Sequence, residues 1–351
     1  MSKSFVPIKT ADIVWPANLP FSSEYEALYY SSDTGLELSR QVFIEANDLI
    51  NRWEALSSDT VSTFSIAETG FGTGLNFLHA WYLWEQHAPP TATLSYISCE
   101  LHPLKSSDLL KALSSWPQLG NLAQELIHQY PVLTPGFHRL SFCRGRVTLT
   151  LMLGDVLECY EQLLICGDGT LESSLRTTSI DAWFLDGFTP SKNPRMWVDS
   201  LFPVIALLSK EGTTLSTNTA ADSVRSNLSL NGFSDLKISE SDPKCPVISA
   251  IFNPITKLRL RQRHTPWHIG KSSNYSNKKA IIIGAGLAGC FTAHSLAKRG
   301  WKITLVDSQN SIGSGASANQ QAVLFPRLSA YCSPMTQFML SAYLYANTRY
   351  K

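Results

Sequence analysis

The sequence predicts an α/β fold: a mostly parallel sheet covered by helices on both faces, followed by a second, smaller strand–helix–strand unit. Short apolar runs alternate with helical patterns up to residue 252, and a further apolar run at residues 279–283 leads into another helical pattern. Such alternation is typical of parallel sheets, whose strands are buried on both faces. With 351 residues, 44% of them hydrophobic, the chain is long enough for two domains with substantial cores.

The pattern places each element of the first unit in turn. The expected strands cover residues 63–67, 94–99, 146–153, 180–185, 212–216 and 247–252, and the expected helices cover residues 75–84, 104–113, 122–127 and 196–208. Ligands of such sheets bind at the carboxyl ends of the strands. The functional loops are therefore expected at residues 68–74, 100–102, 154–155 and 186–197.

The charge of the chain is divided unequally between its two parts. Residues 1–256 contain 16 Lys and Arg against 27 Asp and Glu, whereas residues 257–351 contain 13 against one acid, Asp307. This asymmetry indicates two units with different tasks, or a basic surface that meets a polyanion. We expect a first domain at residues 1–256, a basic and polar linker at 257–277 and a second domain at 278–351.

Several classes of protein are disfavoured by what the sequence lacks. No apolar run approaches the roughly 18 residues that span a bilayer, and the first 15 residues do not have the pattern of a signal peptide. The seven Cys include no C-x-x-C pair, which favours reduced thiols over disulfides or a zinc site. We therefore expect a cytoplasmic protein with no membrane partner and no metal.

A glycine-rich loop follows the first expected strand. Gly70, Gly72 and Gly74 allow a sharp turn and leave no side chain between the backbone and a ligand. The next helix offers free amides that suit a carboxylate or a phosphate. The Gly-x-Gly-x-Gly spacing favours S-adenosylmethionine, a nucleoside joined to an amino acid, over a dinucleotide. A tight turn without a ligand is the alternative.

Acidic residues stand at three successive strand ends of this unit. Glu68 opens the glycine loop, Glu100 ends the second strand and Asp155 follows the third. A carboxylate in the position of Glu100 can accept both ribose hydroxyls of the donor, and Asp155 can accept from the adenine amine. We expect all three to contact the methyl donor, although each alone also fits a solvated acid.

The segment after the fourth expected strand is where a substrate would meet the donor. Asp186 ends this strand and can orient an amine and take its proton during methyl transfer. Phe188 and Trp197 can stack on a base, and Lys192 can meet a phosphate. The alternative is that the aromatic residues belong to the core and that Lys192 is solvated.

The second unit carries a different glycine pattern. An apolar strand leads into Gly284-x-Gly286-x-x-Gly289, a helix follows, and a second strand ends at Asp307. Asp307 lies 23 residues after Gly284, where a dinucleotide-binding unit places the acid that binds ribose. The complete strand–helix–strand context makes this a much more specific signal than the glycines alone.

Two long segments carry a family resemblance: residues 68–78 (ETGFGTGLNFL) and 181–197 (DAWFLDGFTPSKNPRMW). Residues 29–37 (YYSSDTGLE), 96–103 (YISCELHP) and 136–140 (GFHRL) support it. Through these segments, nearly the whole chain resembles the bifunctional bacterial proteins that make 5-methylaminomethyl-2-thiouridine at the wobble position of tRNA.

The resemblance implies a class I, Rossmann-like S-adenosylmethionine methyltransferase sheet, followed by the start of an FAD-binding Rossmann-type βαβ unit. In that family an FAD-dependent oxidoreductase half removes the carboxymethyl group from 5-carboxymethylaminomethyl-2-thiouridine. The methyltransferase half then methylates the resulting 5-aminomethyl-2-thiouridine, so tRNA is the implied partner. By position, the residues that match the family's donor site and substrate acid are Gly70, Gly72, Gly74, Glu100, Asp155 and Asp186.

Two further expectations follow from length and charge. About 75 residues follow the linker, fewer than an FAD domain with a substrate domain needs, so we expect the second unit to be incomplete and to bind FAD poorly. Because residues 1–256 are acidic, we expect tRNA to contact Arg259, Arg261 and Arg263. Two alternatives stay open: a flavoprotein oxidoreductase whose first half only docks tRNA, and a non-catalytic RNA-binding remnant.

Overall fold

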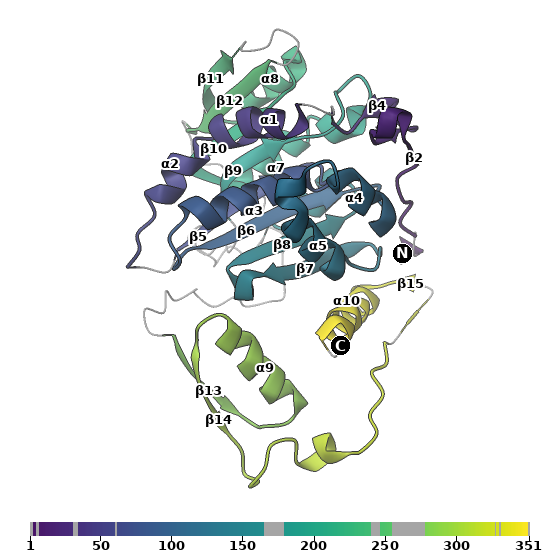
Figure 1. The fold of residues 1–351 in the computed structure, drawn as a ribbon, viewed down its shortest axis with the longest axis vertical. Coiled ribbons are helices and arrows are strands. Elements are labelled where there is room, and N and C mark those ends of the chain that lie inside the picture. Colours follow the sequence, from purple (N-terminus) through teal and green to yellow (C-terminus); the bar gives the residue numbers. More distant parts are fainter. Residues whose placement is uncertain are drawn as a thin grey trace.

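The computed structural model describes residues 3–4, 7–30, 34–59, 62–164, 179–239, 246–254, 278–326, 328–329 and 331–349. In its main body a sheet lies between two layers of helices (Figure 1). The strands of this sheet are β5 (Thr63–Glu68), β6 (Thr93–Glu100), β7 (Gly136–Phe142), β8 (Val147–Leu153), β9 (Ile180–Leu185), β10 (Ser209–Thr217), β11 (Phe233–Ser239) and β12 (Val247–Phe252). The helices are α1 (Gly35–Ser39), α2 (Leu49–Glu54), α3 (Leu75–His87), α4 (Ser106–Leu113), α5 (Gly120–Gln129), α6 (Val156–Glu161), α7 (Leu201–Leu208) and α8 (Asp222–Leu230). Shorter helical turns are η1 (Pro16–Asn18), η2 (Arg40–Glu45), η3 (Pro117–Leu119), η4 (Cys143–Gly145) and η6 (Pro194–Trp197).

The strand order of the sheet locates its ligand-binding edge. The order is β11-β12-β10-β9-β5-β6-β8-β7, with β10, β9, β5, β6 and β8 parallel. At the two ends, β7 is antiparallel to β8, and β12 is antiparallel to both β10 and β11. From β5 the chain moves outward to β6 and β8, then returns to the other side of β5 with β9 and β10. The strand order therefore reverses between β5 and β9, and ligands of open α/β sheets bind at this crevice.

Side chains along the central strands alternate between two cores. In β9, Phe184 packs with residues of α1–α5, whereas Trp183 and Leu185 pack with residues of α6–α8. In β5, Ile66 packs on the side of α1–α5 and Ala67 on the side of α6–α8. Successive strand residues point to opposite faces, so a strand that is apolar at every position needs helices on both sides. The expected fold class is confirmed.

The expected elements are confirmed, except for the start of one helix. The pattern placed a helix at residues 196–208, but the chain forms the short turn η6 first, and α7 begins only at Leu201. Pro203 lies in the first turn of α7, where its missing backbone N–H costs nothing. Within the main body, the sequence pattern indicated neither the strands β7 and β11 nor the helices α1, α2, α6 and α8.

A small antiparallel meander precedes the main body and reaches its ligand-binding edge. Its strands are β2 (Ile13–Val14), β3 (Phe21–Ser22) and β4 (Ala27–Leu28). The β3–β4 connection contains Tyr25, which lines the cavity described below. The meander thus brings residues distant in sequence to the carboxyl ends of β5 and β9.

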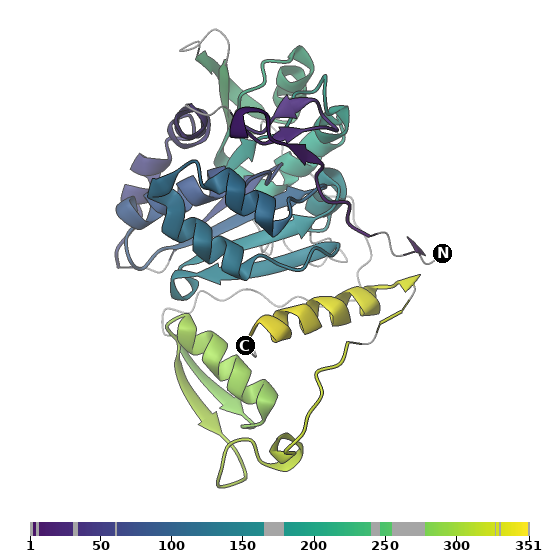
Figure 2. The ribbon, with the colours of Figure 1, turned by 45° about the vertical axis from the view of Figure 1, so that its right-hand side comes forward.

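The second unit has the expected parallel strand–helix–strand form. It consists of β13 (Lys279–Ile283), α9 (Leu287–Lys298) and β14 (Lys302–Val306). An extended segment with the turn η7 (Gly315–Ala318) leads to β15 (Tyr331–Cys332) and α10 (Pro334–Arg349). Figures 1 and 2 both show α10 beside the β7 edge of the main sheet, which it contacts. The expected linker, residues 257–277, lies outside the described residues.

Candidate active site

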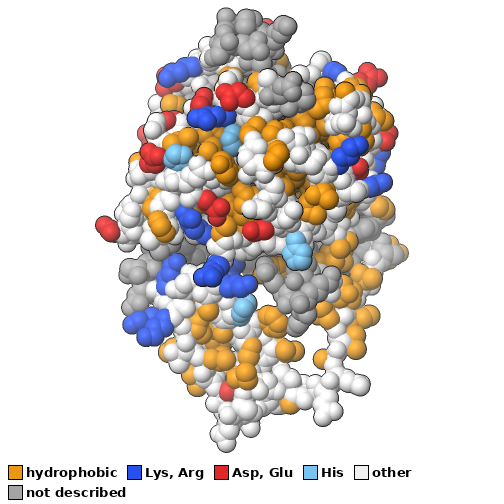
Figure 3. Space-filling model, in the orientation of Figure 1, with side chains coloured by type: hydrophobic (Ala, Val, Ile, Leu, Met, Phe, Trp, Pro, Cys, Tyr) orange, Lys and Arg blue, Asp and Glu red, His pale blue; other side chains and the backbone are white. Residues whose placement is uncertain are grey.

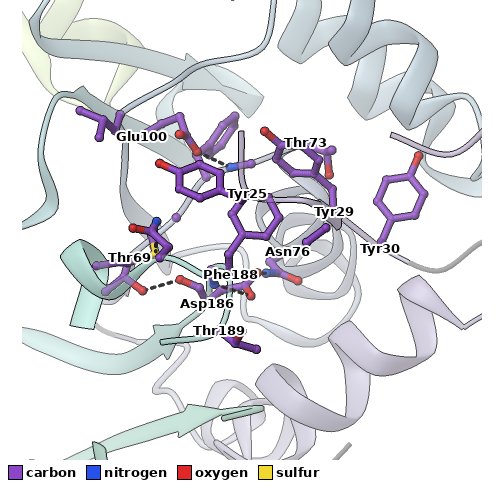
Figure 4. A pocket seen from close by; sticks show the side chains of 18 of the residues that line it. Tyr25, Tyr29, Tyr30, Thr69, Thr73, Asn76, Glu100, Asp186, Phe188 and Thr189 are labelled. Carbon is purple, nitrogen blue, oxygen red and sulfur yellow. Dashed lines mark hydrogen bonds between the residues drawn. The ribbon is translucent and has the colours of Figure 1, made fainter. Parts of the chain in front are cut away.

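The described residues enclose a cavity of about 470 Å³ over the carboxyl ends of the central strands. Figure 4 shows side chains from the glycine loop, the segment after β9 and the N-terminal meander converging on it. Among the residues singled out from the sequence, the cavity is lined by Gly70, Gly72, Glu100, Asp155, Asp186, Phe188 and Lys192. Three others, Glu68, Gly74 and Trp197, are not among its lining residues.

The glycines of the first loop serve different purposes. Gly72 and Gly74 have φ angles of 51° and 72°, which residues with a side chain rarely adopt, and Gly74 precedes the first turn of α3. Gly70 is needed for space instead. A Cβ there would lie 2.8 Å from Cε of Met196 and 3.2 Å from the carbonyl oxygen of Asp186. The glycine loop and the segment after β9 can therefore touch.

Glu100 is held at the end of β6, facing the glycine loop. Its Oε2 accepts a hydrogen bond from the backbone N–H of Gly72 at 2.9 Å, and its Oε1 accepts from that of His102 at 2.9 Å. Each carboxylate oxygen accepts two bonds, so both keep one free position. This arrangement fits an acceptor for a pair of ribose hydroxyls.

Asp155 lies at the start of α6 and also lines the cavity. Its Oδ1 accepts from the backbone N–H groups of Leu157 at 3.0 Å and Glu158 at 3.4 Å, as a helix N-cap does. Its Oδ2 lies 3.3 Å from Nη2 of Arg195, a largely exposed side chain. Arg195 therefore occupies part of the site on the side where the adenine amine was expected.

Asp186 sits where the strand order reverses. Its Oδ1 accepts from the backbone N–H of Gly187 at 2.8 Å, and its Oδ2 accepts from the side-chain amide of Asn76 at 2.7 Å. Its carbonyl oxygen accepts from the Thr69 hydroxyl at 2.7 Å. Burial raises the pKa of the Asp186 carboxyl, against the lowering effect of the bonds from Gly187 and Asn76. A carboxylate with a raised pKa is a better proton acceptor.

Glu68 lies behind the cavity rather than in it. Its side chain is buried, and it accepts from the amide of Asn76 at 3.0 Å and from the Ser98 hydroxyl at 2.7 Å. Burial raises the pKa of Glu68 to about 8, and the charge of Asp186 adds to this increase. The structure therefore separates Glu68 from Glu100 and Asp155, the two strand-end acids that do line the cavity.

The aromatic residues divide between the cavity and the core. Phe188 lines the cavity and stacks on Tyr25, with ring centroids 4.7 Å apart, while Tyr29 meets it edge-on at 5.2 Å. Trp197 is 9% exposed, and its ring N–H donates to the carbonyl oxygen of Phe188 at 2.9 Å. Trp197 therefore supports the loop from the core, the alternative that the sequence had left open.

Lys192 lines the cavity and also links the segment after β9 to the N-terminal meander. Its ammonium group donates to the carbonyl oxygen of Glu26 in the N-terminal meander. Its side chain is exposed, so it is near solvent as well as the cavity.

Sequence reasoning missed Asn76, Tyr25 and Tyr29 as site residues. Asn76 is a polar residue two positions after Gly74 in an otherwise apolar stretch, which is a usable signal for a role at the helix start. Tyr29 opens one of the segments that carried the family resemblance. Tyr25 gave no signal, because only the folding of the meander brings it to Phe188.

The glycine turn of the second unit fits a dinucleotide. Gly284 has a φ of 101°, and a Cβ at Gly289 would overlap the carbonyl oxygen of Gly284. Asp307 accepts from the backbone N–H of Ala285 at 2.6 Å and from that of Gln309 at 2.8 Å, and the bond from Ala285 is the main cause of its lowered pKa. Asp307 thus stays ionised beside the turn, where an acceptor for ribose hydroxyls is needed.

Within the described parts of the chain, no helix is long and apolar enough to cross a membrane. The same residues contain no group of three or more His, Cys, Asp or Glu that could hold a metal ion.

Comparisons with known proteins agree with both halves of this description. Residues 117–251 match the family model of S-adenosyl-L-methionine-dependent methyltransferases, and residues 279–350 match that of FAD dependent oxidoreductases. These two models give S-adenosylmethionine and FAD as the cofactors, the two that the family resemblance implied.

Similar proteins point to one family. The chain is 54% identical over 351 residues to the tRNA 5-methylaminomethyl-2-thiouridine biosynthesis bifunctional protein MnmC of Legionella pneumophila (strain Lens), covering 100% of this chain and 53% of that protein. The protein of the same name from Chromobacterium violaceum is 42% identical over 336 residues, covering 96% of this chain and 48% of that one.

A solved structure supports the fold. The crystal structure of MnmC2 from Aquifex aeolicus has a TM-score of 0.52 and 19% identity, and the match covers 74% of this chain and 73% of that one. The chain spans about half the length of the curated relatives that it matches. Over nearly its whole length, the chain is therefore homologous to bifunctional tRNA 5-methylaminomethyl-2-thiouridine biosynthesis proteins.

Proposed function

We propose that this chain transfers a methyl group from S-adenosylmethionine to the amine of 5-aminomethyl-2-thiouridine at the wobble position of tRNA. The observation that carries the proposal is the position of Asp186. Its carboxylate lines the cavity beside the glycine loop, at the point where the strand order reverses. A methyl donor in this crevice would lie next to a group able to accept a proton.

The donor would be held by residues from three strand ends. The loop of Gly70 and Gly72 leaves room for the backbone to approach the ligand, and the first turn of α3 offers amides to its carboxylate. Glu100 would accept the ribose hydroxyls. Asp155 would accept from the adenine amine, with Arg195 moving aside.

Asp186 would orient the amine of the substrate and receive its proton. S-adenosylmethionine, when bound, supplies an electrophilic methyl carbon on a sulfonium. The lone pair of the neutral amine forms the new N–C bond as the C–S bond breaks, and S-adenosylhomocysteine leaves. Each oxygen of Asp186 keeps one free acceptor position beyond its bonds to Gly187 and Asn76. The proton released by the nitrogen passes to Asp186 and from there to solvent.

The RNA would approach over the aromatic wall of the cavity. Phe188 and Tyr25 offer ring faces on which a splayed-out base can stack, and Lys192 offers a charge to a phosphate. Figure 3 shows Lys and Arg side chains gathered where the main body meets the unit of β13, α9 and β14. Arg259, Arg261 and Arg263, which lie outside the described residues, would supply further charges for phosphates. With tRNA as its partner, the protein would act in the cytoplasm.

We propose residues 1–256 as the methyltransferase domain and residues 278–351 as part of an FAD-dependent oxidoreductase domain. Gly284, Gly286, Gly289 and Asp307 would hold the FAD through its pyrophosphate and ribose. Bound FAD would accept two electrons from the C–N bond of the carboxymethyl group in 5-carboxymethylaminomethyl-2-thiouridine, and water would release that group as an aldehyde acid.

Incubation with radiolabelled methyl donor and tRNA that lacks this modification tests the proposal. The tRNA is then digested and its nucleosides are analysed by mass. We expect label in 5-methylaminomethyl-2-thiouridine. Saturable donor binding without transfer would favour a flavoprotein whose first domain only docks tRNA, and the absence of donor binding in calorimetry would favour a non-catalytic RNA-binding remnant.

A further inference from the structure

Asn76 bridges two carboxyl groups at the back of the cavity. Its side-chain nitrogen donates to Oε1 of Glu68 at 3.0 Å and to Oδ2 of Asp186 at 2.7 Å. An amide nitrogen has two hydrogens, so these two bonds use its full donor capacity. Figure 4 shows Asn76 reaching from α3 towards Asp186, which follows β9.

Glu68 fixes the orientation of this amide. It is 1% exposed, and its second oxygen accepts from the Ser98 hydroxyl at 2.7 Å. Ser98 is fully buried in β6, and its register partner in the sheet is Glu68 itself. The chain Ser98–Glu68–Asn76–Asp186 thus runs from the interior of the sheet to the cavity, and each link is a hydrogen bond between side chains.

The placement of Glu68 is costly unless it serves another group. A buried carboxyl group must be hydrogen-bonded or neutral, and a residue that only filled space here would be apolar. Asn76 is also 8% exposed, and a Leu of similar size would suit the apolar surroundings of α3. The polar pair makes sense if the carboxylate of Asp186 has to be held in one orientation.

We propose that Asn76 and Glu68 are positioning residues for Asp186, with Glu68 fixing the amide of Asn76 and Asn76 fixing the carboxylate that receives the substrate's proton. The expected change in kcat rests on the proposed methyl transfer, whereas the expected change in the pKa of Asp186 does not. Without the amide, the Asp186 carboxylate would be held by the adjacent backbone N–H of Gly187 and would rotate away from the amine.

The substitution Asn76→Ala tests the link to Asp186. We expect kcat for methyl transfer to fall roughly 10- to 100-fold, with the donor dissociation constant within about 3-fold of wild type. The pKa of Asp186, followed by carbon-13 NMR of labelled aspartate and assigned with Asp186→Asn, should rise, because a donor to the charged form is lost. If Asn76→Ala does not fold, Asn76→Ser, whose hydroxyl donates to one carboxylate at a time, replaces it.

A matched control separates positioning from loss of stability. Asn47 is another buried Asn, and its amide donates to Ser216 at 2.6 Å and to the carbonyl oxygen of Phe43 at 2.9 Å, away from the Asp186 carboxylate. Asn47→Ala should lower the melting temperature but leave the pKa of Asp186 unchanged. An equal shift of that pKa in both variants would overturn the proposal.

Two substitutions at Glu68 test the next link. Glu68→Gln keeps an acceptor for Asn76, and the Ser98 hydroxyl can turn to accept from the new amide. We expect kcat of Glu68→Gln at neutral pH to stay within about 3-fold of wild type. The kcat of Glu68→Ala should fall about 10-fold or more. Wild-type kcat in Glu68→Ala, or an unchanged pKa of Asp186 in Asn76→Ala, would contradict the proposal.

The NMR measurement distinguishes this proposal from the proposed function. If the wild-type chain transferred no methyl group but Asn76→Ala still raised the pKa of Asp186, the methyl transfer would be wrong and the positioning right. If transfer occurred and neither the pKa of Asp186 nor kcat changed in Asn76→Ala, the methyl transfer would be right and the positioning role of Asn76 wrong.

Discussion

Asp186 is the residue on which methyl transfer should depend most directly. Asp186→Asn keeps the shape of the side chain but removes its negative charge. We expect kcat to fall about 100-fold or more, with little change in donor affinity, because the proton acceptor is lost and the donor contacts remain. Steady-state kinetics and calorimetry measure the two effects, with the exposed Asp199→Asn as the control.

The same residue gives the reaction a pH dependence. Asp186 accepts a proton only when it is ionised, and its pKa lies above the usual value for Asp. The wild-type kcat should therefore increase as the pH rises through this pKa, and Asp186→Asn should lack that limb of the profile. An identical pH profile in both proteins would assign the proton acceptor to another group.

Glu100 should act on donor binding rather than on the chemical step. Its carboxylate keeps free acceptor positions beyond its bonds to Gly72 and His102. Glu100→Ala should raise the donor dissociation constant about 10-fold or more, with a smaller effect on kcat at saturating donor. Calorimetry with S-adenosylhomocysteine checks this, and unchanged affinity would remove Glu100 from the ribose site.

Glu68 should make stability depend on pH. Its pKa is about 8 in the folded chain against 4.5 as the ordinary value, so the folded state retains a proton that the unfolded state loses. Its contribution to the free energy of unfolding is therefore full below about pH 4.5 and is lost as the pH rises to about 8. Urea unfolding of wild type and Glu68→Gln at pH 5 and pH 8 tests this. The advantage of wild type should shrink with rising pH; a constant difference would contradict the raised pKa.

At the scale of elements, the N-terminal meander completes the substrate side of the cavity. Tyr25 stacks on Phe188, and Lys192 donates to the carbonyl oxygen of Glu26. Tyr25→Ala should raise KM for tRNA about 5-fold or more while donor affinity stays unchanged, because base stacking is lost. Tyr25→Phe retains the ring and is the matched control. If Tyr25→Ala left KM for tRNA unchanged, the meander would have no part in RNA binding.

The central strands were predictable because burial on both faces leaves a continuous apolar run. β9 is buried at every position, and its sequence IDAWFL is an unbroken signal apart from Asp181. The edge strand β7 alternates buried and more exposed residues over a short length, and in β11 only Phe233 is buried; such patterns also occur in loops. The start of α7 was misplaced because Met196 and Trp197 are as apolar as the helix that follows them.

The candidate site was predictable wherever strand ends alone determine position. Glu100, Asp155 and Asp186 follow parallel strands, so their convergence follows from the topology. Whether a side chain of these loops faces the cavity depends on neighbouring elements, which is why Glu68 lies behind it and Trp197 lies in the core. Asn76 and Tyr25 depend on the packing of α3 and of the meander, which no local pattern contains.

At the scale of the whole molecule, RNA binding should rely on the basic part of the chain. The main body carries an excess of acids, so phosphate contacts are expected from residues outside it. Replacing Arg259, Arg261 and Arg263 together by Ala should weaken tRNA binding and flatten its dependence on salt, since each phosphate contact contributes about one unit of slope. Filter binding at several salt concentrations measures the slope, and an unchanged slope would exclude these residues from the interface.

The most direct test of the active site is a crystal structure of the chain with S-adenosylhomocysteine. We predict that the ligand fills the cavity, that its ribose meets Glu100, and that its sulfur lies within about 6 Å of the Asp186 carboxylate, close enough for a methyl carbon and an amine to fit between them. A ligand bound elsewhere, or one whose sulfur points away from Asp186, would contradict this assignment.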